Sequence, residues 1–239
     1  MICLAVSGCQ GRMGQRITQL ALADQDFKIV TLLERPDHPG AHAAIGGVHV
    51  SSTVDALKGA DVLIEFTTPE ATLTHAAACV KHGVKMVIGT TGLNHEQKAE
   101  IKKASAGIPI VFSSNMSVGV NIFLKLAQML AEKTPSPYTV KIIEAHHIHK
   151  KDAPSGTAKT IAEVIESASS KKVQDIQAIR EGEIIGDHKV IFESPDDTII
   201  IDHHAKNRDI FAKGALVAAK FLENKKSGLY TMQDVLGLN

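Results

Sequence analysis

Side chains that can carry chemistry gather in residues 144–158, where the sequence reads Glu-Ala-His-His-Ile-His-Lys-Lys-Asp-Ala-Pro-Ser-Gly-Thr-Ala. The first nine of these residues include three histidines, two lysines and two carboxylates. Histidine donates or accepts a proton near neutral pH, and a neighbouring lysine lowers its pKa and binds anions. Ser155, Gly156 and Thr157 would open a helix, whose N-terminal N–H groups suit a carboxylate. This stretch is the candidate centre of acid–base chemistry.

Several interpretations of this cluster remain open. A reductase that adds hydride to carbon must also add a proton nearby, and a positioned histidine such as His146 is the usual donor. Lys150 would then bind an anionic substrate or donate a proton. A zinc site built from the His-His-x-His nitrogens is an alternative, but no cysteine is near and the carboxylates lack a ligand spacing, so we expect no metal. Solvated loop residues are the third interpretation.

A second motif lies near the amino terminus. The apolar run of residues 2–7 predicts a buried strand, and a glycine-rich turn at 8–14 precedes a helical pattern that ends near residue 23. Residues 27–33 predict a second strand, which ends at Glu34 and Arg35. Glu34 follows Gly14 by 20 residues (34 − 14), the spacing of an acid that binds the ribose hydroxyls of a dinucleotide. The glycine pattern is G-x-x-G-x-x-G, so the strand before it and Glu34 after it carry the prediction.

Strands and helices alternate through the first half of the chain, which favours a parallel, doubly wound sheet. We expect further strands at 61–66, 84–88 and 108–112, with helices from about 69 to 81 and from about 95 to 105. Ligands of such sheets bind beyond the carboxyl ends of the strands. The predicted cofactor residues at these ends are Gly8, Cys9, Gln10, Gly11, Arg12, Met13, Glu34, Arg35, Gly89, Thr90, Thr91, Ser113, Ser114, Asn115 and Met116.

The pattern changes after a predicted long helix at 118–132. A strand at 138–143 leads into the histidine cluster, and a helix follows to about residue 169. Three short strands, at 176–179, 189–192 and 198–201, suggest an open mixed sheet in a second domain. A last helix is expected from 209 to 222. We therefore predict an α/β fold in which residues 1–117 and 209–239 form a Rossmann-type dinucleotide-binding domain, and residues 118–208 form a smaller α+β domain with an open mixed sheet.

Composition limits the partners. Lysine plus arginine and aspartate plus glutamate both number 26 among 239 residues, so the formal net charge is zero. This balance argues against nucleic acid or an anionic membrane as the main partner. The chain has three cysteines, Cys3, Cys9 and Cys79, without a C-x-x-C pair, as expected of free thiols in a reducing cytoplasm. No apolar run approaches the roughly 18 residues that span a bilayer.

These motifs resemble one known family. The run Glu144-Ala145-His146-His147-x-His149-Lys150-x-Asp152-Ala153-Pro154-Ser155-Gly156-Thr157-Ala158 is similar to the signature of 4-hydroxy-tetrahydrodipicolinate reductases, also called dihydrodipicolinate reductases. Four further blocks resemble the family's blocks in the same order: the glycine turn at 8–14, Phe66-Thr67-x-Pro69-Glu70, residues 87–92 and residues 115–121. The resemblance covers essentially the whole chain.

The resemblance implies a cytoplasmic enzyme of the diaminopimelate route to lysine, in which NADH or NADPH reduces a small dicarboxylate. It implies that His146 is the proton donor and Lys150 its partner, and that His147, Gly156 and Thr157 bind substrate. It also implies a homotetramer, with residues 118–208 as the domain for substrate binding and oligomerisation. Thr68 stands where some members carry an arginine for the NADPH phosphate, whereas Arg35 would favour that phosphate, so the nucleotide preference stays open. The chain is also short for the family between about residues 170 and 189. A nucleotide-sensing protein without catalysis remains the alternative.

Overall fold

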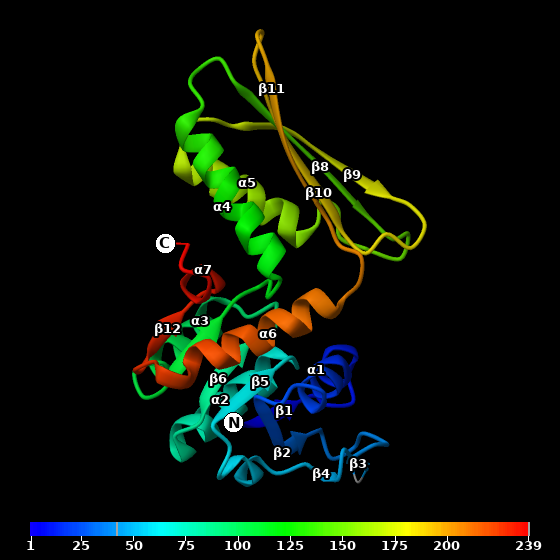
Figure 1. The fold of residues 1–239 in the computed structure, drawn as a ribbon, viewed down its shortest axis with the longest axis vertical. Helices are drawn as coiled ribbons and strands as arrows, with labels where there is room; N and C mark the ends of the chain where they lie inside the picture. The colour runs from blue at the N-terminus through cyan, green and yellow to red at the C-terminus, as the bar shows by residue number, and fades with distance from the viewer. Residues whose placement is uncertain (42, 239) are drawn as a thin grey trace. The chain divides into compact units, whose positions relative to one another are not determined.

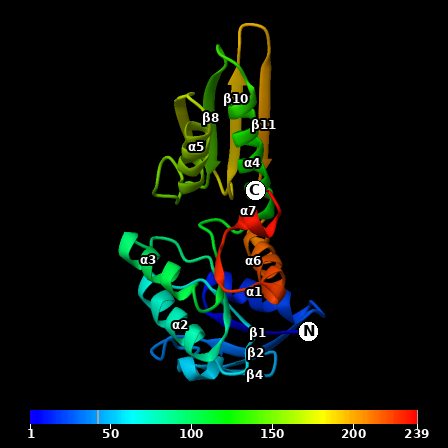
Figure 2. The ribbon, with the colours of Figure 1, turned by 90° about the vertical axis from the view of Figure 1, so that its left-hand side faces the viewer.

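The computed structural model describes residues 1–41 and 43–238. The chain forms two compact units, one from Met1 to Ser117 and again from Phe211 onward, the other from Val118 to Ile210. Both units are α/β, and Figure 1 and Figure 2 show their layers. None of the described helices is both long and apolar enough to cross a bilayer.

The first unit is built on a sheet with the strand order β12-β7-β6-β5-β1-β2-β4-β3. Every neighbouring pair is parallel except β3 and β4. The strands are β1 (Ile2–Ser7), β2 (Phe27–Leu33), β3 (Ala44–Ile45), β4 (Val48–Ser51), β5 (Val62–Glu65), β6 (Lys85–Ile88), β7 (Pro109–Phe112) and β12 (Gly228–Tyr230). The expected parallel, doubly wound sheet is confirmed.

Helices cover both faces of this sheet, α1 and α6 on one side and α2 and α3 on the other (Figure 2). They are α1 (Arg12–Leu22), α2 (Pro69–His82), α3 (His95–Ala104) and α6 (Asp209–Phe221), with the short helices η1 (Val54–Leu57), η2 (Leu222–Asn224) and α7 (Met232–Val235). Because both faces are covered, the central strands are apolar along their length. Leu63, Met86 and Ile110 are completely buried there.

Local signals in the sequence define the ends of these helices. Thr68 caps α2 by accepting the Ala71 N–H, and Pro69 occupies the first helical turn, where no N–H is needed. Asn94 and Gln97 form a reciprocal capping box at the start of α3, as their spacing predicted. The short strands β3, β4 and β12 were not expected, because two to four residues are too few to show a periodic pattern.

The second unit has one four-stranded mixed sheet in the order β11-β10-β8-β9. β8 and β9 are parallel, whereas β10 is antiparallel to β8 and to β11. Its elements are α4 (Val118–Lys133), β8 (Thr139–His146), α5 (Gly156–Ala168), β9 (Val173–Arg180), β10 (Asp187–Glu193) and β11 (Thr198–His204). The predicted mixed sheet is confirmed, and α4 and α5 pack on one of its faces (Figure 1).

Candidate active site

The site in the second unit begins on β8. Side chains of a strand alternate between faces, and Val140, Ile142, Glu144 and His146 all point to the buried side. Glu144 is completely buried and His146 is only 8% exposed. The Nδ1 atom of His146 lies 2.5 Å from Oε2 of Glu144. The histidine is thus held from its Nδ1 side by a carboxylate two residues earlier on the same strand.

The Glu144 carboxylate binds two further groups besides His146, the Arg180 guanidinium and the Ser155 N–H. Arg180, the last residue of β9, donates from Nη1 to Oε2 at 3.0 Å and from Nη2 to Oε1 at 2.8 Å. The Ser155 backbone N–H donates to Oε1 at 3.1 Å. Burial alone would raise the pKa of Glu144, but the hydrogen bonds from Arg180, His146 and Ser155 hold it below its usual value. Glu144 is therefore a buried anion at neutral pH.

His146 keeps its second ring nitrogen available. Within the described part of the chain, Nε2 of His146 has no hydrogen-bond partner. Burial lowers the pKa of His146 below its usual value, and the carboxylate of Glu144 acts against that shift. Nε2 is therefore the nitrogen through which this histidine can deliver a proton.

His188 on β10 is a neighbour that the sequence patterns did not reveal. It pairs directly with Glu144 across the sheet, and its ring centroid lies 5.3 Å from that of His146. Its Nε2 is 3.3 Å from the Ser155 hydroxyl. Burial lowers the pKa of His188 to about 4, so this ring is neutral at physiological pH. A neutral ring therefore packs against His146 from β10.

Lys150 and His147 follow in the loop after β8. The Lys150 ammonium binds Oδ1 of Asp152 at 2.8 Å. Nε2 of His147 lies 3.4 Å from Nη2 of Arg208. His149 is mostly exposed, 3.7 Å from Glu183. Lys150 in this loop and Arg208, which lies between β11 and α6, are therefore two cations in the same unit as His146.

Ser155, Gly156 and Thr157 begin α5 as predicted. The Ser155 hydroxyl accepts the Ala158 N–H, so Ser155 is the N-cap, and it is 2% exposed. The Ser155 hydroxyl oxygen is therefore already engaged in capping α5. Gly156 is different, because a Cβ added there would have no neighbour within 4 Å. The first turn of α5 is thus open at Gly156, where its positive dipole end can attract a carboxylate.

The first unit contains a cavity of about 620 Å³ at the carboxyl ends of its strands. Four of the predicted cofactor residues line it, namely Gly8, Gly11, Glu34 and Arg35, together with Phe66, Thr67, Thr68 and His75 among others. The Glu34 carboxylate accepts the backbone N–H groups of Gln10 at 3.1 Å and of Arg35 at 3.0 Å. It therefore ties the end of β2 to the glycine turn.

The glycine turn is shaped for close approach. Gly8 has φ +60°, a left-handed conformation that favours glycine, and a Cβ there would lie 2.9 Å from the Thr67 methyl carbon. A Cβ on Gly14 would lie 2.0 Å from the Gly8 carbonyl oxygen. Only glycine at position 14 lets α1 start so close to β1, and this leaves the helix N-terminus facing the end of the strand.

The other predicted cofactor residues form three groups, and none of them lines the cavity. Cys9 and Gln10 lie in the glycine turn and Arg12 and Met13 at the start of α1, whereas Gly89, Thr90 and Thr91 follow β6 and residues 113–116 follow β7. Thr90 is buried, and its hydroxyl accepts the Thr67 N–H and lies 2.9 Å from the Thr72 hydroxyl. Met116 is also buried. Any ligand contact from Thr90 or Met116 would therefore come from backbone atoms.

The sequence patterns missed the polar group that backs this cavity. Glu65, at the end of β5, is completely buried. Its Oε2 accepts the Ser7 hydroxyl at 2.5 Å and lies 2.6 Å from Nδ1 of His75. The apolar pattern of β5 does not indicate that Glu65 is buried with a histidine of α2 as its partner, because that contact depends on tertiary packing.

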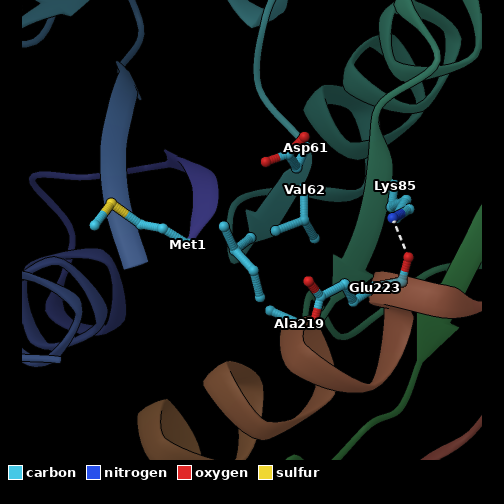
Figure 3. Close-up of a pocket in the computed structure, with 7 residues that line it drawn as sticks. Met1, Asp61, Val62, Lys85, Ala219 and Glu223 are labelled. Carbon is cyan, nitrogen blue, oxygen red and sulfur yellow. Dashed lines mark hydrogen bonds between the residues drawn. The ribbon is translucent and has the colours of Figure 1, made fainter. Parts of the chain in front are cut away.

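Figure 3 shows a second, smaller cavity of about 110 Å³ in the same unit. It lies at the amino ends of β1, β5 and β6, where Lys85 donates to the carbonyl oxygen of Glu223 at 2.7 Å. Ligands of doubly wound sheets bind at the opposite, carboxyl ends. We therefore assign this cavity no role in the chemistry.

Two family models match the chain along almost its whole length. The model for the dihydrodipicolinate reductase N-terminus matches residues 2–116, and the model for the C-terminus matches residues 119–236. The chain belongs to the dihydrodipicolinate reductase family. It is accordingly an oxidoreductase, and this favours catalysis over a purely nucleotide-sensing role.

Individual relatives agree with this assignment. The 4-hydroxy-tetrahydrodipicolinate reductase of Nitrosomonas eutropha is 44% identical over 262 positions, covering 98% of each chain. That of Burkholderia ambifaria is 43% identical and covers 98% of this chain and 99% of its own. The alignments are longer than the 239 residues of this chain, so the relatives contain residues that it lacks.

A solved structure shows the same fold. The dipicolinate-bound dihydrodipicolinate reductase of a Paenisporosarcina species has a TM-score of 0.85 at 24% identity, covering 98% of each chain. The diaminopimelate dehydrogenase of Corynebacterium glutamicum is more distant, with a TM-score of 0.60 and 14% identity. Both likenesses concern the architecture of two α/β units.

Dihydrodipicolinate reductases use NADH or NADPH, and the first unit fits such a cofactor. Its cavity of about 620 Å³ has a carboxylate at Glu34 and a cation at Arg35 in its wall. The backbone at Gly8 and Gly14 leaves no room for a Cβ, which is the close approach that a pyrophosphate requires. Among the described residues, no group of three or more His, Cys, Asp or Glu side chains is arranged to hold a metal ion.

Proposed function

We propose that this chain reduces 4-hydroxy-tetrahydrodipicolinate to tetrahydrodipicolinate with His146 as the proton donor. One observation carries the proposal: the buried Glu144 carboxylate binds both Nδ1 of His146 and the N–H of Ser155, at 2.5 and 3.1 Å. A proton donor and the N-terminus of an anion-binding helix are therefore held by the same carboxylate. An acid and a carboxylate site are what reduction of a dicarboxylate needs.

The chemistry balances with one proton from the protein. The bound nucleotide supplies a hydride, which forms a new C–H bond on the ring. Overall, the ring hydroxyl is replaced by hydrogen, and the hydroxyl leaves with the added proton as water. Protonated His146 supplies that proton through Nε2 and takes another from solvent after each turnover.

Side chains of the second unit bind the dicarboxylate. The first turn of α5, at Gly156 and Thr157, offers N–H groups to one carboxylate. Lys150 and Arg208 supply positive charge that suits the other, and the contact between Arg208 and Nε2 of His147 supports their acting together. The dipicolinate bound in the Paenisporosarcina reductase is likewise a small cyclic dicarboxylate, which supports this substrate class. Ser155 contributes by starting the helix.

Nucleotide binding belongs to residues 1–117 and 209–239 in this proposal, and substrate binding and oligomerisation to residues 118–208. Two compact units with similar limits support the division. Free thiols at Cys3, Cys9 and Cys79 support a reducing cytoplasm as the compartment. The substrate places the reaction in the diaminopimelate route to lysine.

Arg35 governs the choice between the two nucleotides in this account. Its side chain lies in the wall of the cavity and is 67% exposed, and its guanidinium lies 3.4 Å from the Asp37 carboxylate. A 2′-phosphate would gain a charge-assisted bond there. We expect Arg35→Gln to weaken NADPH binding by roughly tenfold, or about 1.4 kcal/mol, and to leave NADH binding nearly unchanged. Titration calorimetry with both nucleotides checks this, with Lys58→Gln as a control for net charge. Equal losses for both nucleotides would remove Arg35 from phosphate recognition.

A homotetramer is the proposed assembly, formed through the sheet of the second unit. The face away from α4 and α5 carries Ile143, Ile191 and Ile200 between charged residues, and Ile200 is 54% exposed. Such apolar residues on an uncovered sheet suit contact with another copy. We expect Ile200→Glu to dissociate the assembly in light scattering, while Val217→Glu on α6 leaves it intact. A wild-type protein that is monomeric at micromolar concentration contradicts the proposal.

Isotope transfer tests the reaction directly. The protein is incubated with nucleotide deuterated at the transferable position, while the synthase of the pathway generates the substrate. Mass spectrometry is expected to find one deuterium in tetrahydrodipicolinate. A sensing protein would bind the nucleotide and form no deuterated product, and such a result would reject the proposed function.

A further inference from the structure

We propose that Glu144 and Arg180 are a positioning pair, which fixes His146 as a protonated donor and aligns the loop that carries Lys150. The inference rests on the proposed function, since it assigns His146 as the acid. It extends that function by naming two residues that act through His146 and Lys150.

Hydrogen bonds hold the Glu144 carboxylate in one position. The carboxylate is completely buried, and each of its oxygens accepts two hydrogen bonds from the described groups: Oε2 from His146 and Arg180, Oε1 from Arg180 and Ser155. A buried charge is costly unless it is paired and fully hydrogen-bonded. Glu144 meets that condition only in this geometry, which sets the ring of His146 and directs Nε2 away from the pair.

Arg180 joins the two parts of the site. Besides the fork to Glu144, its Nη2 donates to the carbonyl oxygen of Asp152 at 2.5 Å. The side chain of the same Asp152 binds the Lys150 ammonium at 2.8 Å. One guanidinium therefore restrains His146 through Glu144 and Lys150 through Asp152. The register of the sheet, in which Arg180 lies beside His146, brings it there.

The charges around His146 show why the carboxylate is needed. Burial, the Lys150 ammonium and the Arg180 guanidinium all lower the pKa of His146, whereas Glu144 raises it. His188, packed against the ring from β10, is neutral because its own pKa is about 4. Among these neighbours on β8, β9, β10 and the following loop, Glu144 is the one that favours the protonated ring. Without its charge, His146 would lose its proton at a lower pH.

The space around Nε2 fits this role. Gly186, before β10, is buried, and a Cβ placed there would lie 3.1 Å from Nε2 of His146. Such a contact is tight enough to push the ring from its place. The absence of a side chain at Gly186 thus lets the ring keep the position that Glu144 sets.

The test compares pH profiles of kcat in the full-length protein. Glu144→Gln keeps the size of the side chain and removes its charge. We expect its kcat to fall at least about tenfold at pH 8 and clearly less at a pH below the ring pKa measured for wild type, because one unit of pKa changes the protonated fraction tenfold only above the pKa. The Kd for NADH should stay within about twofold. Glu166→Gln serves as the matched control, because it removes a carboxylate of α5 that pairs with Lys172.

A second pair of measurements keeps the test decisive if Glu144→Gln folds poorly. Arg180→Lys retains the charge but loses the fork, so we expect kcat to fall with little change in the pH profile. An unchanged kcat in Arg180→Lys would reject the positioning pair even if Glu144→Gln cannot be measured. Nitrogen-15 spectra of His146 report the pKa of its ring without turnover. That pKa should stay near the wild-type value in Arg180→Lys and be lower in folded Glu144→Gln.

The outcomes separate this inference from the proposed function. If wild type turns over and His146→Gln does not, but Glu144→Gln keeps the wild-type profile and ring pKa, only the positioning pair is rejected. A loss at pH 8 that is equally large below the wild-type ring pKa would mean a merely structural role and also reject it. Failure of wild type to turn over rejects the proposed function, while the ring pKa still decides the effect of Glu144.

Discussion

Replacing His146 with glutamine is expected to lower kcat by roughly 10² to 10⁴-fold, the usual contribution of a positioned general acid. Glutamine preserves much of the volume and can still hydrogen-bond to Glu144, but it has no proton to transfer at neutral pH. The wild-type side chain has its Nδ1 bound 2.5 Å from Glu144 and its Nε2 without a partner among the described residues. The loss should therefore fall on the chemical step.

Steady-state kinetics and nucleotide binding measure the two consequences separately. We expect the Kd for NADH to stay within about twofold of wild type, because a lost transition-state interaction lowers kcat and leaves binding unchanged. His149→Gln is the matched control, since His149 belongs to the same cluster but is mostly exposed. An unchanged kcat in His146→Gln would remove His146 from the mechanism.

Wild-type activity should also decline as the pH rises through the pKa of His146. The acid must be protonated, and burial holds its pKa below the usual value for histidine despite the nearby Glu144 carboxylate. If the protonation of His146 alone sets the pH profile, activity is highest below that pKa and is lost above it. This direction makes Glu144, which opposes the shift, important to catalysis at neutral pH.

Gly14→Ala is expected to weaken NADH binding at least about tenfold, which corresponds to about 1.4 kcal/mol. The added Cβ would lie 2.0 Å from the Gly8 carbonyl oxygen and 2.7 Å from the Cys9 Cα. Both neighbours are backbone atoms, so the turn itself must move. Overpacking of this kind typically costs about 1–3 kcal/mol, and the thermal midpoint should fall as well.

Calorimetric titration with NADH and thermal unfolding followed by circular dichroism check this result. Gly107→Ala is the control, because its nearest neighbour would be a Val80 methyl at 3.4 Å, an ordinary contact. Wild-type affinity in Gly14→Ala, with the fold intact, would show that the glycine turn does not hold the nucleotide. It would leave the site of the second unit untouched.

Much of the fold follows from local sequence patterns. The buried strands β1, β2, β5 and β6, the cap at Thr68 and the capping box at Asn94 were each predictable from a few neighbouring residues. The edge strand β12 and the two-residue β3 were not, because pairing with a neighbouring strand defines them and their own residues do not. Local patterns thus predict the central layers better than the edges.

The candidate site shows the same limit. His146 stands out in the sequence, and the alternation of a strand already places Glu144 on its face. Arg180 lies 36 residues from Glu144, and only the register of β9 against β8 brings it there. His188 reaches the site in the same way through β10. Partners supplied by other strands depend on tertiary pairing, which no local spacing encodes.

The most direct test of the account follows NAD(P)H absorbance in the presence of the pathway's synthase, which generates 4-hydroxy-tetrahydrodipicolinate continuously. We expect rapid nucleotide oxidation with wild type, using NADH, NADPH or both, and only background oxidation with His146→Gln. No oxidation of either nucleotide by a folded protein that binds NADH would contradict it.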